Sequence, residues 1–316
     1  MSEWIHPPAA PAAKGPGGPV LRVVSPAGPV ERRRVEASIS FLEAAGYRVL
    51  ATEGIYSATD YLAGDDARRL AELQDALDDP EVDVVWAARG GYGTMRLLPE
   101  LSLERLLAAP KIVAGFSDIT ALHAALGARG LVSLHSCVLA GVAEQQPEDR
   151  AALLAILAGE TPPPLALEGP VIVPGQAAGR VLGGNLSVLT RLVGTPYLPS
   201  LSGALLLLED VGERPYRLDR MLTHLELAGV PGQLAGVIVG EHAGCEEPGG
   251  GLTALEVITE RLSRWGLPAM AGAPVGHGKW NRAIPLGVTA RLDTTTATLT
   301  FAGPAFPLPA PQDAPA

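Results

Sequence analysis

The sequence is poor in several kinds of residue, and each shortage excludes a class of protein. Only two of its 316 residues are cysteines, Cys137 and Cys245, which are too few for a disulfide framework. Lys and Arg number 24 against 34 Asp and Glu, so the net charge is −10 and no basic face for nucleic acid is predicted. No apolar run reaches the 18 or so residues of a membrane span, so none is expected.

Few aromatic residues and few metal-binding patterns narrow the choice further. Aromatics make up 4% and hydrophobic residues 47%, so Leu, Val, Ile and Ala must fill the core. His135 with Cys137, and His242 with Cys245, lack a structural zinc spacing, so we predict no metal. The Pro-, Ala- and Gly-rich segment 1–18 lacks the pattern of a secretory signal, and we expect a flexible tail on a cytoplasmic protein.

The first half of the chain alternates short apolar runs with helical patterns. Strands are predicted at residues 20–24, 47–51, 82–87, 112–114 and 131–134. Strands separated by helices form a parallel sheet with right-handed crossovers, which indicates an α/β fold. The loops 25–28, 89–93 and 115–118 follow strand ends, so we expect them to converge on one ligand-binding face.

A Pro-rich stretch near the middle marks a boundary between two predicted domains. The expected division is a tail at 1–18, an N-terminal domain at 19–160, a linker at 161–174, a C-terminal domain at 175–308 and a tail at 309–316. In the second domain, the apolar strand 204–208 ends in Glu209 and Asp210, and residues 287–301 alternate like a β-hairpin. We therefore expect a mixed α/β domain with a substantial β component.

Three residues have the chemistry of a nucleophilic triad. Ser117 lies between a predicted strand and a predicted helix, and Gly115 before it permits a tight turn. A serine hydroxyl becomes a nucleophile when a base takes its proton and a third group orients that base. Glu209 ends an apolar strand, where a carboxylate needs a partner, and His277 lies between two glycines in a loop.

Each of these residues also has an ordinary structural interpretation. Ser117 and Asp118 are favoured helix caps, Glu209 could end its strand in solvent, and His277 could be a plain loop histidine. The order Ser, Glu, His occurs in α/β-hydrolases, but their elbow reads G-x-S-x-G, and Ile119 stands where its last glycine would be. The residues taken singly leave both interpretations open.

Taken together, five segments resemble the LD-carboxypeptidase family of serine peptidases, which includes muramoyltetrapeptide carboxypeptidases and microcin C immunity proteins. They are V-V-S-P-A-G (23–28), R-G-G-Y-G (89–93), G-F-S-D-I-T-A-L (115–122), G-G-N-L-S (183–187) with L-L-L-L-E-D-V-G-E (205–213) and Y-R-L-D-R-M-L (216–222), and G-H-G (276–278) with P-L-G (285–287). The segments occur in the family's order and span residues 23 to 287.

The resemblance implies a fold and a set of roles. It implies a flavodoxin-like N-terminal domain, a β-rich C-terminal domain, a site between them and a homodimer. Ser117 matches the nucleophile, Glu209 the acid and His277 the base, while the backbone N–H groups of Gly91 and Asp118 match the oxyanion hole. No metal or organic cofactor is implied.

The expected activity is hydrolysis of an L,D peptide bond that releases a C-terminal D-alanine from muropeptide tetrapeptides in cell-wall recycling. Arg89, Lys279 and Arg282 are candidates to bind the substrate carboxylate. One alternative is a microcin C-like peptidyl-nucleotide amide hydrolase, for which Trp280 could stack on the base. A more remote alternative is a non-catalytic protein that binds a ligand in its cleft, although such a protein has no need of a triad.

Overall fold

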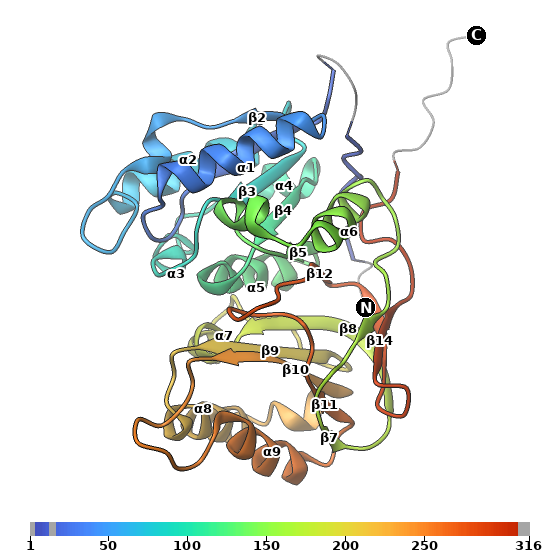
Figure 1. The fold of residues 1–316 in the computed structure, drawn as a ribbon. Helices are drawn as coiled ribbons and strands as arrows, with labels where there is room; N and C mark the ends of the chain where they lie inside the picture. The colour runs from blue at the N-terminus through green and yellow to red at the C-terminus, as the bar shows by residue number, and fades with distance from the viewer. Residues whose placement is uncertain (1–3, 13–16, 309–316) are drawn as a thin grey trace.

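The computed structural model describes residues 4–12 and 17–308, and it shows two stacked α/β layers (Figure 1). The first sheet has the strand order β12-β5-β4-β3-β1-β2. Its strands are β1 (Val20–Val24), β2 (Arg48–Leu50), β3 (Val84–Ala87), β4 (Ile112–Gly115), β5 (Ser133–His135) and β12 (Ile284–Leu286). The order β2-β1-β3-β4-β5 is the flavodoxin-like order, as expected, and these strands are parallel.

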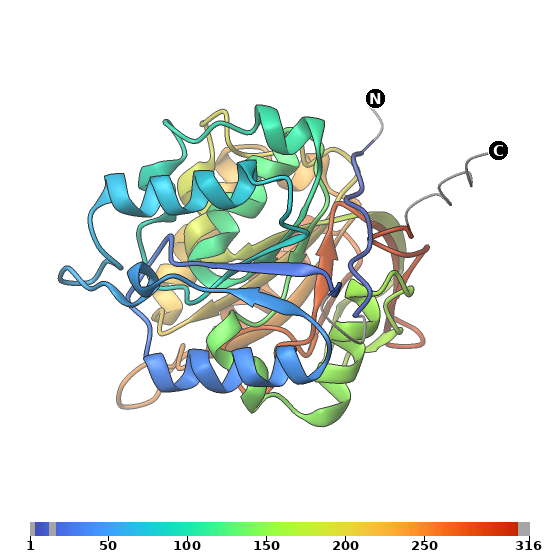
Figure 2. The same cartoon turned by 90° about the horizontal axis from the view of Figure 1, so that it is seen from above.

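Helices cover both faces of this sheet because its strands are apolar on both sides. One face packs against α1 (Arg32–Ala44) and α6 (Pro147–Leu157). The other packs against α2 (Asp66–Asp78), α4 (Glu104–Ala108) and α5 (Thr120–Ala128), with the short α3 (Thr94–Leu97) beside them. Seen from above, α1 and α2 lie on opposite sides of the sheet (Figure 2).

The second sheet is mixed, with the order β6-β14-β13-β8-β9-β10-β11-β7. Its strands are β6 (Leu165–Ala166), β7 (Val171–Val173), β8 (Gln176–Asn185), β9 (Leu205–Val211), β10 (Gly236–Ala243), β11 (Ala269–Ala271), β13 (Thr289–Asp293) and β14 (Thr298–Phe301). Its helices α7 (Leu186–Leu192), α8 (Pro215–Leu227) and α9 (Ala254–Trp265) share one apolar core with alternate residues of β9 and β10. In Figure 1, α8 and α9 lie on the side away from the first sheet.

The strands do not divide between the sheets in simple chain order. β6 and β7 lie within the segment 161–174, which we expected to be a linker, and both pair into the second sheet. β12 comes late in the chain but pairs antiparallel with β5 of the first sheet. The domain limits stay predictions, and the segment between β11 and β12 joins the two sheets. No helix within the described residues is long and apolar enough to cross a membrane.

The start of the chain packs against the body, which differs from the flexible tail we expected. Ile5 exchanges backbone hydrogen bonds with the segment at Gly130 and Val132, at 2.7 and 2.9 Å. The indole of Trp4 covers Gly287, where a Cβ would collide with the ring. Residues 1–3, 13–16 and 309–316 of the predicted tails lie outside the described residues.

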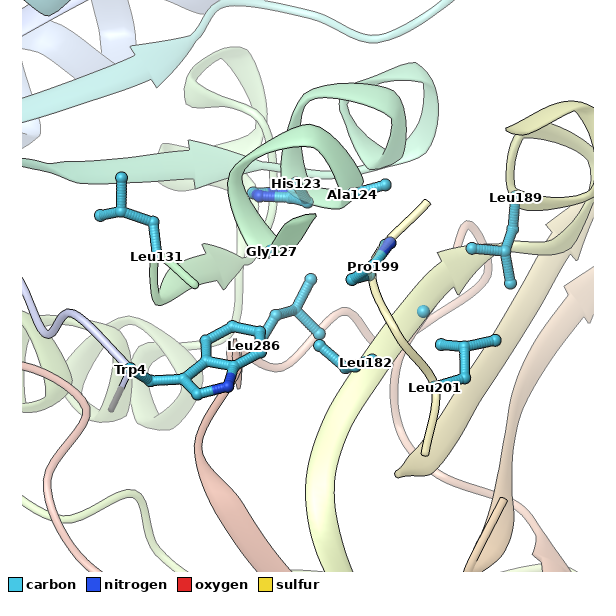
Figure 3. Close-up of a pocket in the computed structure, with 11 residues that line it drawn as sticks. Trp4, His123, Ala124, Gly127, Leu131, Leu182, Leu189, Pro199, Leu201 and Leu286 are labelled. Carbon is cyan, nitrogen blue, oxygen red and sulfur yellow. The ribbon is translucent and has the colours of Figure 1, made fainter. Parts of the chain in front are cut away.

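Trp4 also closes a small apolar cavity where the two sheets meet (Figure 3). The cavity has a volume of about 10 Å³, which is about the space that one water occupies, so it is too small for a substrate. Leu182 of β8 and Leu286 of β12 line it with Leu131, so residues from both sheets contribute to the wall. Trp4 therefore contributes to the junction between the layers.

Trp4→Ala should lower the free energy of unfolding by about 2 kcal/mol, because truncation of a half-buried indole exposes Gly287 and enlarges the cavity. Trp4→Phe should cost less, because a ring still covers the junction. Urea unfolding of both variants measures the difference, and an alanine variant as stable as the wild type would contradict the packing role.

Candidate active site

Ser117 lies in a tight turn directly after β4. Its φ is +65°, a left-handed conformation that few residues other than glycine adopt. A 3₁₀ turn spans Ser117–Ile119, and α5 begins at Thr120. The positive φ keeps Ser117 itself out of a right-handed helix. Such strained turns present the serine of a nucleophile elbow.

The three loops predicted to converge do so, and glycine permits their close approach. The Gly28 N–H donates to the Gly90 carbonyl at 3.0 Å. A Cβ on Gly90 would lie 2.7 Å from Cβ and 2.8 Å from Oγ of Ser117, so a larger residue would displace the hydroxyl. A Cβ on Gly91 would lie 3.3 Å from Gly28. The loops after β1, β3 and β4 therefore meet at Ser117.

A short hydrogen bond joins Glu209 to His277. The imidazole Nδ1 donates to Glu209 Oε2 at 2.7 Å, which leaves Nε2 as the ring nitrogen free to exchange a proton with a nucleophile. Glu209 is fully buried at the end of β9, and its Oε1 has no partner among the described residues. The His277 side chain is 17% exposed, so it remains open to a substrate.

Phe116 connects this pair to the serine. Its ring centroid lies 4.6 Å from that of His277, and Ser117 is the next residue in the chain. No hydrogen bond joins Ser117 Oγ to His277 in the described part of the chain. Catalytic hydrogen bonds are often long without substrate and tighten when substrate binds. The structure thus places the three predicted residues at one junction, with Ser117 on the first layer, Glu209 on the second and His277 in the segment that joins them.

A cavity of about 250 Å³ opens at Ser117 and is also lined by Gly91 and Asp118. The predicted oxyanion donors therefore border the same space as the hydroxyl. The Asp118 side chain faces inward, where its carboxylate accepts the Thr94 N–H at 2.8 Å. Burial raises the pKa of Asp118, and the hydrogen bond from Thr94 opposes that shift. This bond ties the turn at Ser117 to the start of α3.

The cavity also contains residues that the sequence did not single out. Asp210 accepts hydrogen bonds from Asn185 Nδ2 at 3.2 Å and from the Ser187 N–H at 2.8 Å. Burial, with the charge of Glu209, raises the pKa of Asp210 to about 6. Asn185 caps α7 through the Val188 N–H at 3.1 Å. Asn185 and Asp210 belong to the motifs G-G-N (183–185) and L-E-D (208–210). Only the pairing of β8 with β9 shows that these two motifs lie side by side.

The three cations proposed for carboxylate binding do not line this cavity. Arg89 donates to the Pro29 carbonyl at 2.6 Å, and Arg282 donates to Asp149 at 2.7 Å. Lys279 lies over the Trp280 ring at 4.5 Å from its centroid. The basic residue that lines the cavity is Arg191 of α7, which no sequence motif had indicated.

A β-bulge next to Glu209 directs a second carboxylate toward the His277 loop. Val239 pairs with Leu208 and His242 with Asp210, so Gly240 and Glu241 together oppose Glu209.

The bulged residue, Glu241, lies against the loop on both sides of His277. A Cβ on Gly276 would lie 3.0 Å from Glu241 Cβ, and one on Gly278 would collide with its carboxylate. The Trp280 N–H donates to Glu241 Oε1 at 3.4 Å, and the Glu241 N–H donates to Val275 at 2.8 Å. Glu241 therefore supports the loop that carries His277.

Two buried histidines lie behind the site. His135 packs edge-on against Phe116, with ring centroids 5.8 Å apart, and neither of its ring nitrogens has a hydrogen-bond partner among the described residues. Burial lowers the pKa of His135 to about 3 and that of His123 to about 4, so both are neutral near pH 7. Within residues 4–12 and 17–308, no group of three or more His, Cys, Asp or Glu is arranged to hold a metal.

The two-layer fold brings the hydroxyl of Ser117 to the same junction as the paired imidazole and carboxylate, an arrangement compatible with a hydrolase. Family comparisons are more specific: residues 21–136 match the LD-carboxypeptidase N-terminal domain, and residues 178–292 match the LD-carboxypeptidase C-terminal domain. The chain belongs to the LD-carboxypeptidase family, as its sequence motifs indicated.

Known relatives are similar to this chain over almost its whole length. A putative carboxypeptidase of Streptomyces coelicolor is 42% identical, covering 94% of this chain and 97% of its own. The murein tetrapeptide carboxypeptidase of Pseudomonas aeruginosa is 34% identical, covering 86% and 92%. The solved structure of the microcin C7 self-immunity protein in complex with aspartyl sulfamoyl adenosine has a TM-score of 0.84, covering 96% and 99%; at 22% identity, it shows a shared fold.

Glu241→Ala should lower kcat by roughly 10- to 100-fold with little change in KM, because a small displacement of the base is costly. Glu241→Gln, which retains an acceptor for the Trp280 N–H, should recover much of the rate. Glu246→Ala, an exposed neighbour, is the matched control. Equal rates for Glu241→Ala and Glu246→Ala would show that Glu241 does not support the loop.

His135→Leu should make stability less sensitive to acid. Because the pKa of His135 is lowered to about 3 by folding, the unfolded chain binds a proton below about pH 6.5 that the folded chain rejects. Each such histidine costs about 1.4 kcal/mol per pH unit between its two pKa values. Urea unfolding at pH 6 and pH 4 should show a smaller loss for the variant, whereas parallel losses would contradict the assignment.

Proposed function

We propose that this protein is a serine carboxypeptidase that hydrolyses the L,D peptide bond before a C-terminal D-alanine in muropeptide tetrapeptides. The Glu209–His277 hydrogen bond, next to the strained turn of Ser117, is the observation that carries the proposal. The name of the Pseudomonas aeruginosa relative supports this substrate class. The proposed setting is cell-wall recycling in the cytoplasm, by a homodimer.

In the first half of the proposed reaction, His277 Nε2 takes the Ser117 proton and Oγ attacks the carbonyl carbon of the scissile bond. The negative charge then forms on the carbonyl oxygen, where the N–H groups of Gly91 and Asp118 can donate to it. Glu209 holds the imidazole by its Nδ1 proton and stabilises the cation that forms. His277 gives its proton to the amine of D-alanine, which leaves.

In the second half, a water molecule replaces the departed amine. His277 takes a proton from that water, and the resulting hydroxide attacks the acyl-serine carbonyl. Collapse of the second tetrahedral intermediate breaks the ester, and His277 returns the proton to Ser117 Oγ. The tripeptide leaves with a new carboxylate, and every proton transfer uses groups of this chain.

The identities of the relatives favour a murein peptide over a peptidyl-nucleotide. In the same kind of sequence comparison, the chain is 34% identical to the murein tetrapeptide carboxypeptidase and 25% identical to the microcin C7 self-immunity protein of Escherichia coli. One face of Trp280, the residue considered for base stacking, has Lys279 over it. Parallel assays with a muropeptide and with an aminoacyl sulfamoyl adenylate separate the two substrates.

Ser117→Ala should abolish nearly all hydrolysis of a tetrapeptide ending in D-alanine, by at least about 10³-fold, because no other group forms the acyl-enzyme. Folding should be intact, since alanine fits beside Gly90 and adds no atoms. Ser40→Ala, on an exposed part of α1, is the matched control and should keep full activity. D-alanine release followed by liquid chromatography measures both.

Substantial turnover by Ser117→Ala would overturn the assignment of the nucleophile. If Ser117→Ala loses all activity but also unfolds at a lower midpoint, the loss could come from misfolding. Ser117→Cys, which preserves the size of the nucleophile, is then the variant to measure. Capture of the substrate as a thioester on that cysteine, detected by intact mass, would then support the proposed role, and its absence would count against it.

A further inference from the structure

A second pocket, of about 390 Å³, lies beside the cavity of Ser117, between α7 and α8. Its polar lining includes the guanidinium groups of Arg191, Arg217 and Arg220, the imidazole of His224 and the carboxylate of Glu213. Three guanidinium groups thus face a single carboxylate in one pocket. This is a local excess of positive charge on a chain whose net charge is −10.

Two of these arginines have no acidic partner. Among residues 4–12 and 17–308, neither Arg191 nor Arg220 forms an ion pair with a carboxylate. One nitrogen of Arg191 donates to the Ser187 carbonyl at 2.9 Å, which holds the side chain along α7. Glu213 is already shared between Arg217, at 3.3 Å, and the Ser187 hydroxyl, at 3.4 Å. The pocket can therefore accept an anion.

The charges of α8 are sorted between its two sides. Its acidic residues Asp219 and Glu226 pair with Arg261 of α9, on the side away from the pocket. Arg217, Arg220 and His224 follow one another at intervals of three and four residues, so they share the opposite face of the helix. Ion pairs within the helix therefore do not neutralise that face.

The basic pocket adjoins the cavity at the nucleophile. Arg191 and Glu213 line both spaces, so a molecule that reaches Ser117 can extend past Arg191 toward Arg220. Guanidinium groups bind carboxylates through paired N–H donors, and a peptide substrate carries its negative charge as carboxylates. The net charge of −10 repels an anionic substrate, and the cations of this pocket offset that repulsion locally.

We propose that Arg191 and Arg220, with His224, form a subsite for a substrate carboxylate carried on the acyl side of the scissile bond. This inference rests on the proposed function, because it assumes that a peptide is cleaved at Ser117. The subsite binds the same group in the ground state and in the transition state, so it acts on KM rather than on kcat.

The test compares two tetrapeptides that share the same L,D bond and differ in one side chain before it, which is a carboxylate in one and a carboxamide in the other. For the wild type, KM should be about 3- to 10-fold lower for the carboxylate peptide, since exposed charge pairs contribute modestly. Arg220→Ala should remove this difference and leave kcat unchanged. Added salt should narrow the difference in the wild type.

Arg214→Ala is the matched control. It removes an exposed arginine at the start of α8 that pairs with Glu247 at 3.7 Å and lies outside the pocket lining. This variant should keep the preference for the carboxylate peptide. Equal KM values for both peptides in the wild type, or a preference that survives in Arg220→Ala, would overturn the subsite. If the wild type cleaves neither peptide, the proposed function itself fails.

Discussion

The hydrogen bond between Glu209 and His277 is the constraint on which the site depends. A fully buried carboxylate at the end of an apolar strand is costly unless a donor meets it, and the His277 Nδ1–H at 2.7 Å is the donor that the fold supplies. Two neighbouring residues pack against His277 or its loop. The bulge on β10 directs Glu241 against the His277 loop, and Phe116 packs on the imidazole ring.

The chain path explains how Ser117 and His277, 160 positions apart, come to lie near one another. After β11 in the second sheet, the chain passes through the His277 loop and enters the first sheet as β12, paired with β5. The loop is thus fixed at both ends, to a different layer at each. Ser117 belongs to the first layer and Glu209 to the second, and the path of the segment between β11 and β12 brings His277 between them. The packing of Trp4 over Gly287, just beyond β12, adds to the same junction.

The sequence was sufficient for the features that depend on local patterns. Alternating apolar runs and turn signals predicted the parallel sheet, and the motifs around Ser117, Glu209 and His277 predicted which side chains would meet. Other features depend on contacts between distant segments. The strands β6, β7 and β12 are only two or three residues long, too short for a recognisable pattern, and they pair with strands far away in the chain. Glu241 and Arg191 have no motif of their own. The bulge on β10 shows that Glu241 faces the His277 loop, and the packing of α7 beside α8 shows that Arg191 faces the basic pocket.

The proposed activity is tested by mass spectrometry of the products that the wild-type protein forms from a tetrapeptide-stem muropeptide. We expect free D-alanine and a tripeptide stem whose new carboxylate carries one oxygen from isotopically labelled water. An unchanged tetrapeptide, or cleavage at any other bond of the stem, would contradict it.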